Sequence, residues 1–338
     1  MLRALELARR GCGHTRPNPP VGAVVVKGGK VVGEGWHRRA GGDHAEVAAM
    51  KNAARRGVKS QKGATLYVTL EPCSRPGRVG ACTDAIIAAG ISKVVYAVPD
   101  PNPKNRGRAR IVLSKAGVKC ERSESDVVNC LARELVGPFA KHVATGLPYV
   151  TVKIAMSLDG KICDDWGDAR WISSEAARRE TGRMRERVDA IMVGGETIRK
   201  DDPSLLSHGR QNLDLIRVVV SKSGNLPRNA QVFADGVPNK TFVFDDARKA
   251  LVELGKMGVL HVLCEGGLKL ARSLAEDGLV DSWYSVVSPC VIGSRSIRDK
   301  IVFHSAAATR DAHFTGGDLM MNSYKAKEFR KGGTCSLD

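Results

Sequence analysis

The sequence has no segment with the character of a signal peptide or a transmembrane span. Its N-terminal residues 2–10 alternate charged with apolar side chains in a helical pattern, and no collagen, heptad or solenoid repeat follows. We therefore expect a cytoplasmic globular protein that does not contact a membrane.

Aromatic residues are scarce, at 5% of the chain, although the net charge is +17. Such a charge is typical of proteins that bind nucleic acid, anionic membranes or phosphorylated small molecules, and also of a solvated basic surface. The positive residues form no long run, and few rings are available to stack on bases. The composition thus disfavours nucleic acid as a partner.

A disulfide framework is lacking too. The nine cysteines are an odd number scattered over 338 residues, at positions 12, 73, 82, 120, 130, 163, 264, 290 and 335. Small secreted domains instead pair closely spaced cysteines. We expect most of these residues to be buried thiols.

The length points to two domains, because one domain commonly holds roughly 150 residues. The hydrophobic pattern resets at 136–139 and at 145–148, so the sequence predicts domains at 1–143 and 147–330. The polar tail at 327–338 should be frayed.

The first half predicts a three-layer α/β domain. Two β-rich runs, 21–26 and 31–36, flank a glycine turn and indicate a hairpin. Asp43 is the expected N-cap of a helix that ends at Arg56. Further strands are expected at 64–70 and 93–98, and further helices at 2–10, 82–89 and 106–116.

The second half predicts another α/β domain, because strand and helix patterns alternate again. Strands are expected at 149–156, 189–193, 259–264, 282–292 and 318–325, and helices at 174–187, 248–256 and 268–276.

A candidate zinc site lies in the first half. His44 begins an expected helix, Cys73 follows a buried strand and Cys82 begins the next helix. One imidazole and two thiolates leave the fourth position of Zn²⁺ open, as a catalytic site requires. Each residue alone is common without zinc, but the combination in this order is typical of a zinc site. The helix macrodipole should favour the Cys82 thiolate.

Glu46, two residues after His44, is predicted to carry protons rather than to bind the metal. Water on zinc is acidic enough to supply hydroxide near neutral pH. A carboxylate here can accept the water proton and deliver it to a departing amine, the chemistry of zinc nucleobase deaminases.

The first half resembles the cytidine-deaminase superfamily, and more narrowly the deaminase half of the bifunctional riboflavin biosynthesis deaminase–reductase family. The matching segments are 15–22, 33–37, 44–46, 67–74, 82–85 and 100–103. The resemblance implies that Asn18 and His37 line the substrate pocket. The amide of Asn18 can donate to and accept from a base edge, although between two prolines it also suits a turn.

The chain departs from this family near the second zinc cysteine. Arg75 replaces a usual histidine, and Val-Gly-Ala at 79–81 replaces Thr-Pro-Pro. Arg75 and Arg78 can clamp a phosphate, or they are solvated loop charges.

The second half resembles the reductase half of the same family, whose fold is similar to dihydrofolate reductase. The matching segments are 148–160, 171–174, 189–197, 201–205 and 264–267. Glycine pairs at 194–195 and 266–267 let backbone amides approach an anion at a helix N-terminus, although Gly-Gly is also a common turn. The sequence contains no G-x-G-x-x-G, so a Rossmann domain is not supported.

The resemblance also implies binding roles in this half. Residues expected to contact the cofactor NADPH are Trp171, Thr197, Asp201 and Gly267. Residues expected to hold the substrate are Lys153, Arg185, Leu205 and Glu265. Arg185 is the expected phosphate partner; without the resemblance it is equally a surface helix charge.

The reductase half departs from the family at three positions: Ala169 replaces a usual serine, His208 a usual arginine and Ser221 a common aspartate. Arg210 can replace the missing arginine at the substrate phosphate. If His208 does so instead, affinity falls as pH rises through the imidazole pKa, because only the protonated ring is charged.

The resemblance implies riboflavin biosynthesis. A zinc-dependent hydrolysis removes the ring amine of 2,5-diamino-6-ribosylamino-4-pyrimidinone 5'-phosphate, a pyrimidine nucleotide, and NADPH then reduces the ribosyl group to ribityl. Two alternatives stay open: a zinc deaminase of another nucleotide or of tRNA, and an inactive second domain that serves as a scaffold or oligomerisation module. A homo-oligomer is expected.

Overall fold

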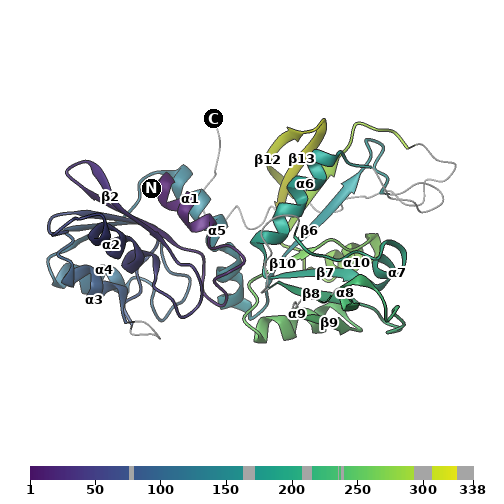
Figure 1. The fold of residues 1–338 in the computed structure, drawn as a ribbon, viewed down its shortest axis with the longest axis horizontal. Coiled ribbons are helices and arrows are strands. Elements are labelled where there is room, and N and C mark those ends of the chain that lie inside the picture. The colour runs from purple at the N-terminus through teal and green to yellow at the C-terminus, as the bar shows by residue number, and fades with distance from the viewer. Residues whose placement is uncertain are drawn as a thin grey trace. The chain divides into compact units, whose positions relative to one another are not determined.

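The chain forms two compact units, Met1–Leu147 and Pro148–Asp338, and each contains one sheet (Figure 1). This computed structural model describes residues 1–75, 80–162, 172–207, 215–234, 236, 240–292 and 307–325. Within those ranges, no helix has both the length and the apolar character needed to span a membrane.

The N-terminal unit is built on a five-stranded sheet in the order β2-β1-β3-β4-β5. Strand β1 pairs antiparallel with β2 and β3, while β3, β4 and β5 are parallel. The predicted hairpin turns at Gly28 and Gly29, whose positive φ angles of 54° and 74° suit glycine. The strands are β1 (Gly22–Lys27), β2 (Lys30–Trp36), β3 (Thr65–Leu70), β4 (Lys93–Val98) and β5 (Lys119–Arg122).

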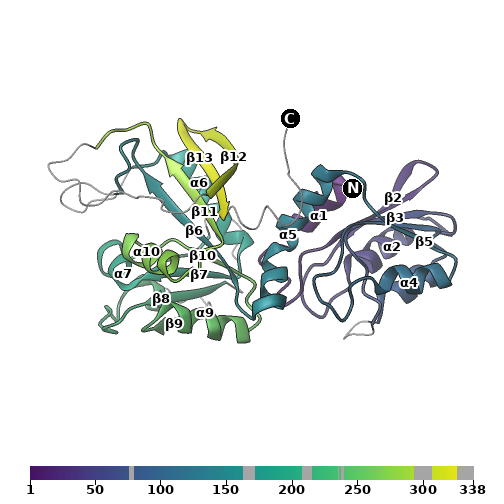
Figure 2. The same cartoon turned by 180° about the vertical axis from the view of Figure 1, so that it is seen from behind.

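Helices cover both faces of this sheet (Figure 2). They are α1 (Leu2–Arg9), α2 (Ala45–Arg55), α3 (Cys82–Ala88), α4 (Arg108–Lys115) and α5 (Asp126–Thr145). One apolar cluster joins Leu66 and Val68 of β3 to α2, α3 and α4. A second joins Leu70 to α1 and α5. Two cores on opposite faces give the predicted three layers.

Helix α2 packs closely on strand β2. A Cβ at Gly35 would lie 2.3 Å from the backbone nitrogen of Ala49, so only glycine permits this close packing. The N-cap of α2 is His44, and the prediction of Asp43 is wrong. The carboxylate of Asp43 instead pairs at 2.8 Å with Lys51, a residue of α2. The first predicted metal ligand therefore stands at a helix N-terminus.

The hydrophobic pattern changes at 136–139, but helix α5 is not interrupted there. The helix continues through Pro138 to Thr145 and is capped by Gly146, which has a φ of 74°. Its side chains Val128, Ala132 and Val136 are buried in the second cluster, and this packing outweighs the one backbone donor that the proline removes.

The C-terminal unit contains an eight-stranded sheet in the order β12-β13-β11-β6-β10-β7-β8-β9. The strands from β11 to β9 in this order are parallel, and β13 and β12 extend the sheet antiparallel. The strands are β6 (Tyr149–Met156), β7 (Ala190–Gly194), β8 (Ile216–Val220), β9 (Thr241–Phe244), β10 (His261–Cys264), β11 (Ser282–Val287), β12 (Ala307–Thr315) and β13 (Asp318–Lys325).

The helices of this unit are α6 (Glu175–Met184), a 3-10 turn at Arg185–Arg187, α7 (Gly195–Asp201), α8 (Gln231–Ala234), α9 (Ala247–Lys256) and α10 (Leu268–Glu276). The alternation of parallel strands with helices confirms the predicted α/β class. Helix α7 starts directly after β7, and α10 starts after β10 and a short loop at 265–267, so both helix N-termini lie at the carboxyl edge of the sheet.

Candidate functional site

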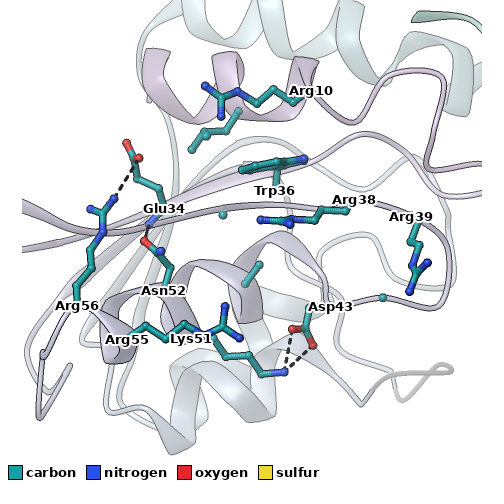
Figure 3. Close-up of a pocket in the computed structure, with 14 residues that line it drawn as sticks. Arg10, Glu34, Trp36, Arg38, Arg39, Asp43, Lys51, Asn52, Arg55 and Arg56 are labelled. Atoms are coloured by element: carbon teal, nitrogen blue, oxygen red, sulfur yellow. Dashed lines mark hydrogen bonds and ion pairs between the residues drawn. The ribbon is translucent and has the colours of Figure 1, made fainter. Parts of the chain in front are cut away.

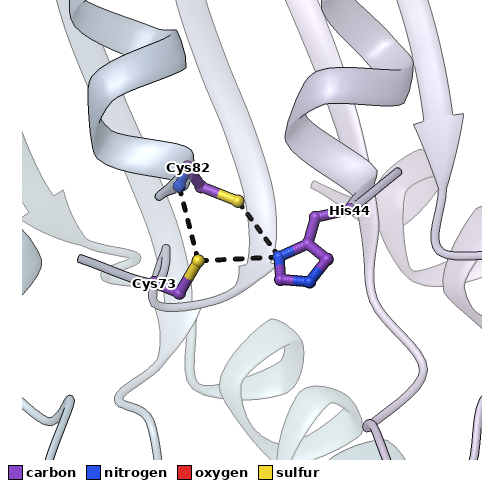
Figure 4. A group of neighbouring side chains, drawn as sticks. All are labelled: His44, Cys73 and Cys82. Carbon is purple, nitrogen blue, oxygen red and sulfur yellow. Dashed lines mark hydrogen bonds between the residues drawn. The ribbon is translucent and has the colours of Figure 1, made fainter. Parts of the chain in front are cut away.

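His44, Cys73 and Cys82 meet in the N-terminal unit (Figure 4). His44 is the N-cap of α2, Cys82 is the first residue of α3, and Cys73 lies in the loop after β3. Their ligand atoms all lie within 4.8 Å of one another. Donors bound to one tetrahedral zinc ion lie up to about 3.8 Å apart. The imidazole and the two sulfurs therefore fit a single zinc ion after small side-chain shifts.

Hydrogen bonds already link the three side chains. The Nδ1 atom of His44 lies 3.2 Å from Sγ of Cys82 and 3.5 Å from Sγ of Cys73. The backbone N–H of Cys82 also donates to Sγ of Cys73, at 3.4 Å. These contacts hold the three donor atoms close together.

The two thiols differ in their affinity for a proton. A hydrogen bond from the Cys82 thiol lowers the pKa of Cys73 to about 4. The pKa of Cys82 is raised, because it donates that hydrogen bond and is buried. The predicted effect of the helix macrodipole concerns the Cys82 thiolate that zinc would bind, and it stays a prediction. Zinc takes both sulfurs as thiolates, so metal binding must displace the Cys82 proton.

Glu46 lies in the same site, two residues after His44. It is the second residue of α2 and is buried, with 4% of its surface exposed. Burial raises the pKa of its carboxyl group, because a charge in this setting loses its hydration. The group interacts with His44 and both cysteines, which brings the predicted proton carrier beside the predicted ligands.

Asn18 and His37 form the adjoining wall. Nδ1 of His37 lies 3.0 Å from the carbonyl oxygen of Asp43, so this nitrogen carries the proton. Its Nε2 then accepts from the amide of Asn18, at 3.1 Å. Burial lowers the pKa of His37 and keeps the ring neutral. The rings of His37 and His44 meet edge to face at 5.3 Å.

A buried carboxylate that the sequence reasoning did not assign holds the Cys73 loop. Glu71 accepts backbone N–H groups of Asp100, Gly107 and Ala109, at 3.0 to 3.2 Å. The only sequence signal is its place between a buried strand and Pro72. Glu71 thus ties the loop after β3 to the loop after β4.

Asn105 forms a second hydrogen-bonded link to this loop. Its amide donates to the carboxylate of Asp100 at 2.7 Å, and its side-chain oxygen accepts from the backbone N–H and the hydroxyl of Ser74 at 2.9 and 3.1 Å. Arg75, the next residue, is exposed. Arg78 lies outside the described residues.

In the C-terminal unit, Arg185 and Glu265 form a bidentate ion pair at 2.8 and 3.0 Å, with side chains 14% and 12% exposed. Arg185 also donates to the carbonyl of Leu206 at 2.8 Å, beside the buried Leu205. Burial lowers the pKa of Lys153, and Glu265 partly opposes this shift. The four predicted substrate residues therefore come together, although Arg185 faces a carboxylate here.

The two glycine pairs lie side by side at the carboxyl edge of the sheet. A Cβ at Gly266 would lie 2.9 Å from the backbone nitrogen of Gly194, and one at Gly267 would lie 3.9 Å from the hydroxyl of Thr197. The predicted cofactor residues Thr197 and Gly267 are thus neighbours, and Asp201 ends the same helix as Thr197.

Ser221 packs beneath this edge, where its side chain would lie 2.8 Å from a Cβ at Gly195. Trp171, Ala169, His208 and Arg210 lie outside the described residues. Arg217 of β8 is a buried arginine that the sequence reasoning did not single out; it donates to the carbonyl of Ser204 at 3.2 Å and so supports the loop that carries Leu205.

Two protein families match the chain. Residues 1–98 match the cytidine and deoxycytidylate deaminase zinc-binding region, and residues 148–318 match the RibD C-terminal domain. The chain is 35% identical to riboflavin biosynthesis protein RibD of Escherichia coli K12 and 37% identical to that of Bacillus amyloliquefaciens. These matches cover 87% of this chain and 88% and 84% of the two relatives.

Solved structures are similar over nearly the whole chain. RibD of Acinetobacter baumannii superposes with a TM-score of 0.81 at 32% identity. A diaminohydroxyphosphoribosylaminopyrimidine deaminase/5-amino-6-(5-phosphoribosylamino)uracil reductase of Thermotoga maritima superposes with a TM-score of 0.84 at 30% identity. Both cover 96% of this chain and 97% of the other.

Proposed function

The chain belongs to the RibD family, whose deaminase and reductase activities serve riboflavin biosynthesis, and on this premise we propose which substrate, cofactors and residues carry the two reactions. The substrate is 2,5-diamino-6-ribosylamino-4-pyrimidinone 5'-phosphate. The N-terminal unit replaces its ring amine by a carbonyl oxygen from water and releases ammonia. The C-terminal unit then reduces the ribosyl group to ribityl with NADPH.

The observation that carries the first step is the grouping of His44, Cys73 and Cys82 beside a buried carboxylate. Zn²⁺ held by these three residues would acidify a water molecule and so supply the nucleophile. Glu46 accepts a proton from the attacking water and delivers it to the departing amine. Asn18 and His37 orient the ring, and the fixed Nδ1–H tautomer of His37 leaves its Nε2 as an acceptor.

For the second step, NADPH would supply hydride to the sugar carbon. Thr197, Asp201 and Gly267 hold the cofactor, together with Trp171. The carboxyl edge of the parallel sheet and the N-terminus of α10 suit its phosphate groups. Lys153, Leu205 and Glu265 position the substrate.

The substrate phosphate faces Arg185, and the arginines at 75 and 78 serve the same group in the deaminase. To bind the phosphate, Arg185 must release Glu265, and both groups can accept two hydrogen bonds from the guanidinium. His208 or Arg210 completes the phosphate contacts. We expect the chain to work in the cytoplasm as a homo-oligomer.

A two-stage assay tests this function on the full chain. Zinc-loaded protein without NADPH should release ammonia from the proposed substrate, and NADPH added afterwards should be oxidised in a 1:1 ratio to that ammonia. The two units are read separately in this design. Ammonia release without any NADPH oxidation would mean that the C-terminal unit is a scaffold. The absence of both signals would refute the substrate assignment.

The glycine pairs give a prediction for the reductase alone. Gly266→Ala should raise the KM for NADPH by about 5- to 150-fold, because its Cβ would meet the Gly194 backbone at 2.9 Å and overpacking costs about 1–3 kcal/mol. Gly194→Ala is the matched control, since its Cβ has no neighbour closer than 3.9 Å. Deaminase kinetics should not change in either variant. Equal KM values for the two variants would contradict the steric argument.

A further inference from the structure

A basic pocket of about 410 Å³ opens on the N-terminal unit, between the end of α1, β2 and α2 (Figure 3). None of the predicted metal ligands lines it. Its charged lining consists of the cations Arg10, Arg38, Arg39, Lys51, Arg55 and Arg56 and the acids Glu34 and Asp43. We call it the arginine pocket.

Both acids of the arginine pocket already have partners. Glu34 accepts from Arg3 at 2.7 and 3.3 Å, and this contact lowers the pKa of Glu34. Both oxygens of Asp43 accept from Lys51 at 2.8 Å. The acids therefore leave most of the cationic lining uncompensated.

Four guanidinium groups in the pocket have no carboxylate within salt-bridge distance in the described part of the chain. They are Arg10, Arg38, Arg39 and Arg55, and each of them is exposed. Like charges gathered in a concave site repel one another and attract an anion. Nothing in the proposed deaminase or reductase chemistry uses these four residues.

Trp36 organises two of these arginines. The guanidinium carbons of Arg10 and Arg38 lie 5.2 and 4.5 Å from the centre of its ring, and Figure 3 shows them on opposite sides of the indole. Both contacts are cation–π interactions, which hold planar guanidinium groups in place. With both ring faces occupied, the indole offers no platform on which a base could stack.

We propose that the arginine pocket binds a short phosphate chain, either free or as part of a nucleoside triphosphate. Guanidinium groups bind phosphate oxygens bidentately, and several can share one chain. A triphosphate carries a charge of roughly −4, which balances six cations and two acids better than the roughly −2 of a monophosphate. The volume lies in the range of small-ligand sites, and the covered indole argues against single-stranded nucleic acid.

The proposal is tested by titrating the full, zinc-loaded chain at low salt with tripolyphosphate, ATP and inorganic phosphate. Calorimetry should give one saturable site for the first two ligands and at least about tenfold weaker binding of phosphate. The Arg38→Ala/Arg55→Ala variant should bind tripolyphosphate about tenfold or more weakly, because each lost contact is charge-assisted. Arg110→Ala, an exposed arginine on α4, should bind as the native chain does.

Tryptophan fluorescence locates the site independently of the heat signal. Tripolyphosphate should change the emission of the native chain, and Trp36→Phe should abolish most of that change. Equal affinities for tripolyphosphate and ATP would identify the phosphate chain as the ligand, and tighter ATP binding would identify a nucleotide; either result supports the proposal.

Three outcomes would overturn the proposal: no saturable binding, unchanged binding in the double variant, or binding of a single-stranded oligonucleotide alone. Zinc content measured after each titration separates pocket binding from metal removal by the ligand. None of these readouts depends on the proposed deaminase substrate, so failure here and failure of the proposed function are distinguishable.

Discussion

Cys73→Ser should leave a chain that contains almost no zinc and shows no detectable deamination, while NADPH still reduces substrate that has been deaminated beforehand. Cys73 is the more acidic of the two thiols, with a pKa lowered to about 4, and it accepts hydrogen bonds from His44 and Cys82. A serine hydroxyl does not ionise near neutral pH and is a poor zinc ligand. Without metal, the pKa of the water is no longer lowered toward neutrality, and the hydroxide nucleophile is lost.

The measurement is metal analysis of the purified variant together with separate assays of ammonia release and NADPH oxidation. Cys120→Ser is the matched control, because Cys120 is a buried thiol of the same unit whose pKa burial raises to about 11, so it stays protonated. That control should keep a full complement of zinc. A native zinc content in Cys73→Ser would remove this residue from the ligand set.

Much of the fold can be predicted from local patterns. The glycine turn at 28–29 and the buried strands at 64–70 and 149–156 depend on neighbours in the sequence, and the structure places all three within a residue or two of the prediction. The same holds for the helix at 268–276. Where patterns are short or interrupted, prediction fails: β5 and β9 have four residues each and were not expected.

Helix α5 was missed for a different reason. Gly137 and Pro138 both disfavour helix, so the sequence around them reads as a boundary. The helix persists because Val128 and Ala132 on one side of the glycine and Val136 beside it are all buried against α1, β3 and β4. Tertiary packing of this kind has no local signature, and it overrides propensity.

The grouping of His44, Cys73 and Cys82 could be expected, since each stands at the end of a predictable helix or strand. The distribution of protons among them could not. It depends on which thiol donates to the other and on how deeply each is buried, and both follow from three-dimensional contacts. The same limit applies to Arg185, whose partner Glu265 lies 80 residues away.

The composition suggests that the chain binds an anion, but it does not show where the arginine pocket lies. A net charge of +17 gives no hint of where cations gather. Arg10 follows α1, Arg38 follows β2 and Arg55 ends α2, and these three elements line one pocket, with α2 packed tightly on β2 at Gly33 and Gly35. Close backbone packing therefore shapes both the metal site and the basic pocket on the same unit.

The Glu46→Gln variant should fold and retain zinc, but its rate constant for deamination should fall about 10²- to 10⁴-fold, which is the usual contribution of a positioned acid–base group. The amide has the shape of the carboxylate but cannot accept a proton from water or return it to the amine. Because Glu46 is the second residue of α2 and is buried, the glutamine should occupy the same space without disturbing the helix. The loss should appear in kcat, with KM little changed.

Three measurements separate this role from a structural one. Zinc content and thermal stability should match the native chain, reduction of pre-deaminated substrate should be unaffected, and only ammonia release should fall. Glu121→Gln removes the same charge from β5, where the carboxylate pairs with Lys119 and Lys93, and it should leave deamination intact. If Glu46→Gln deaminates within a few-fold of the native rate, another group carries the proton. If it loses zinc as well, Glu46 supports the metal site rather than the chemistry.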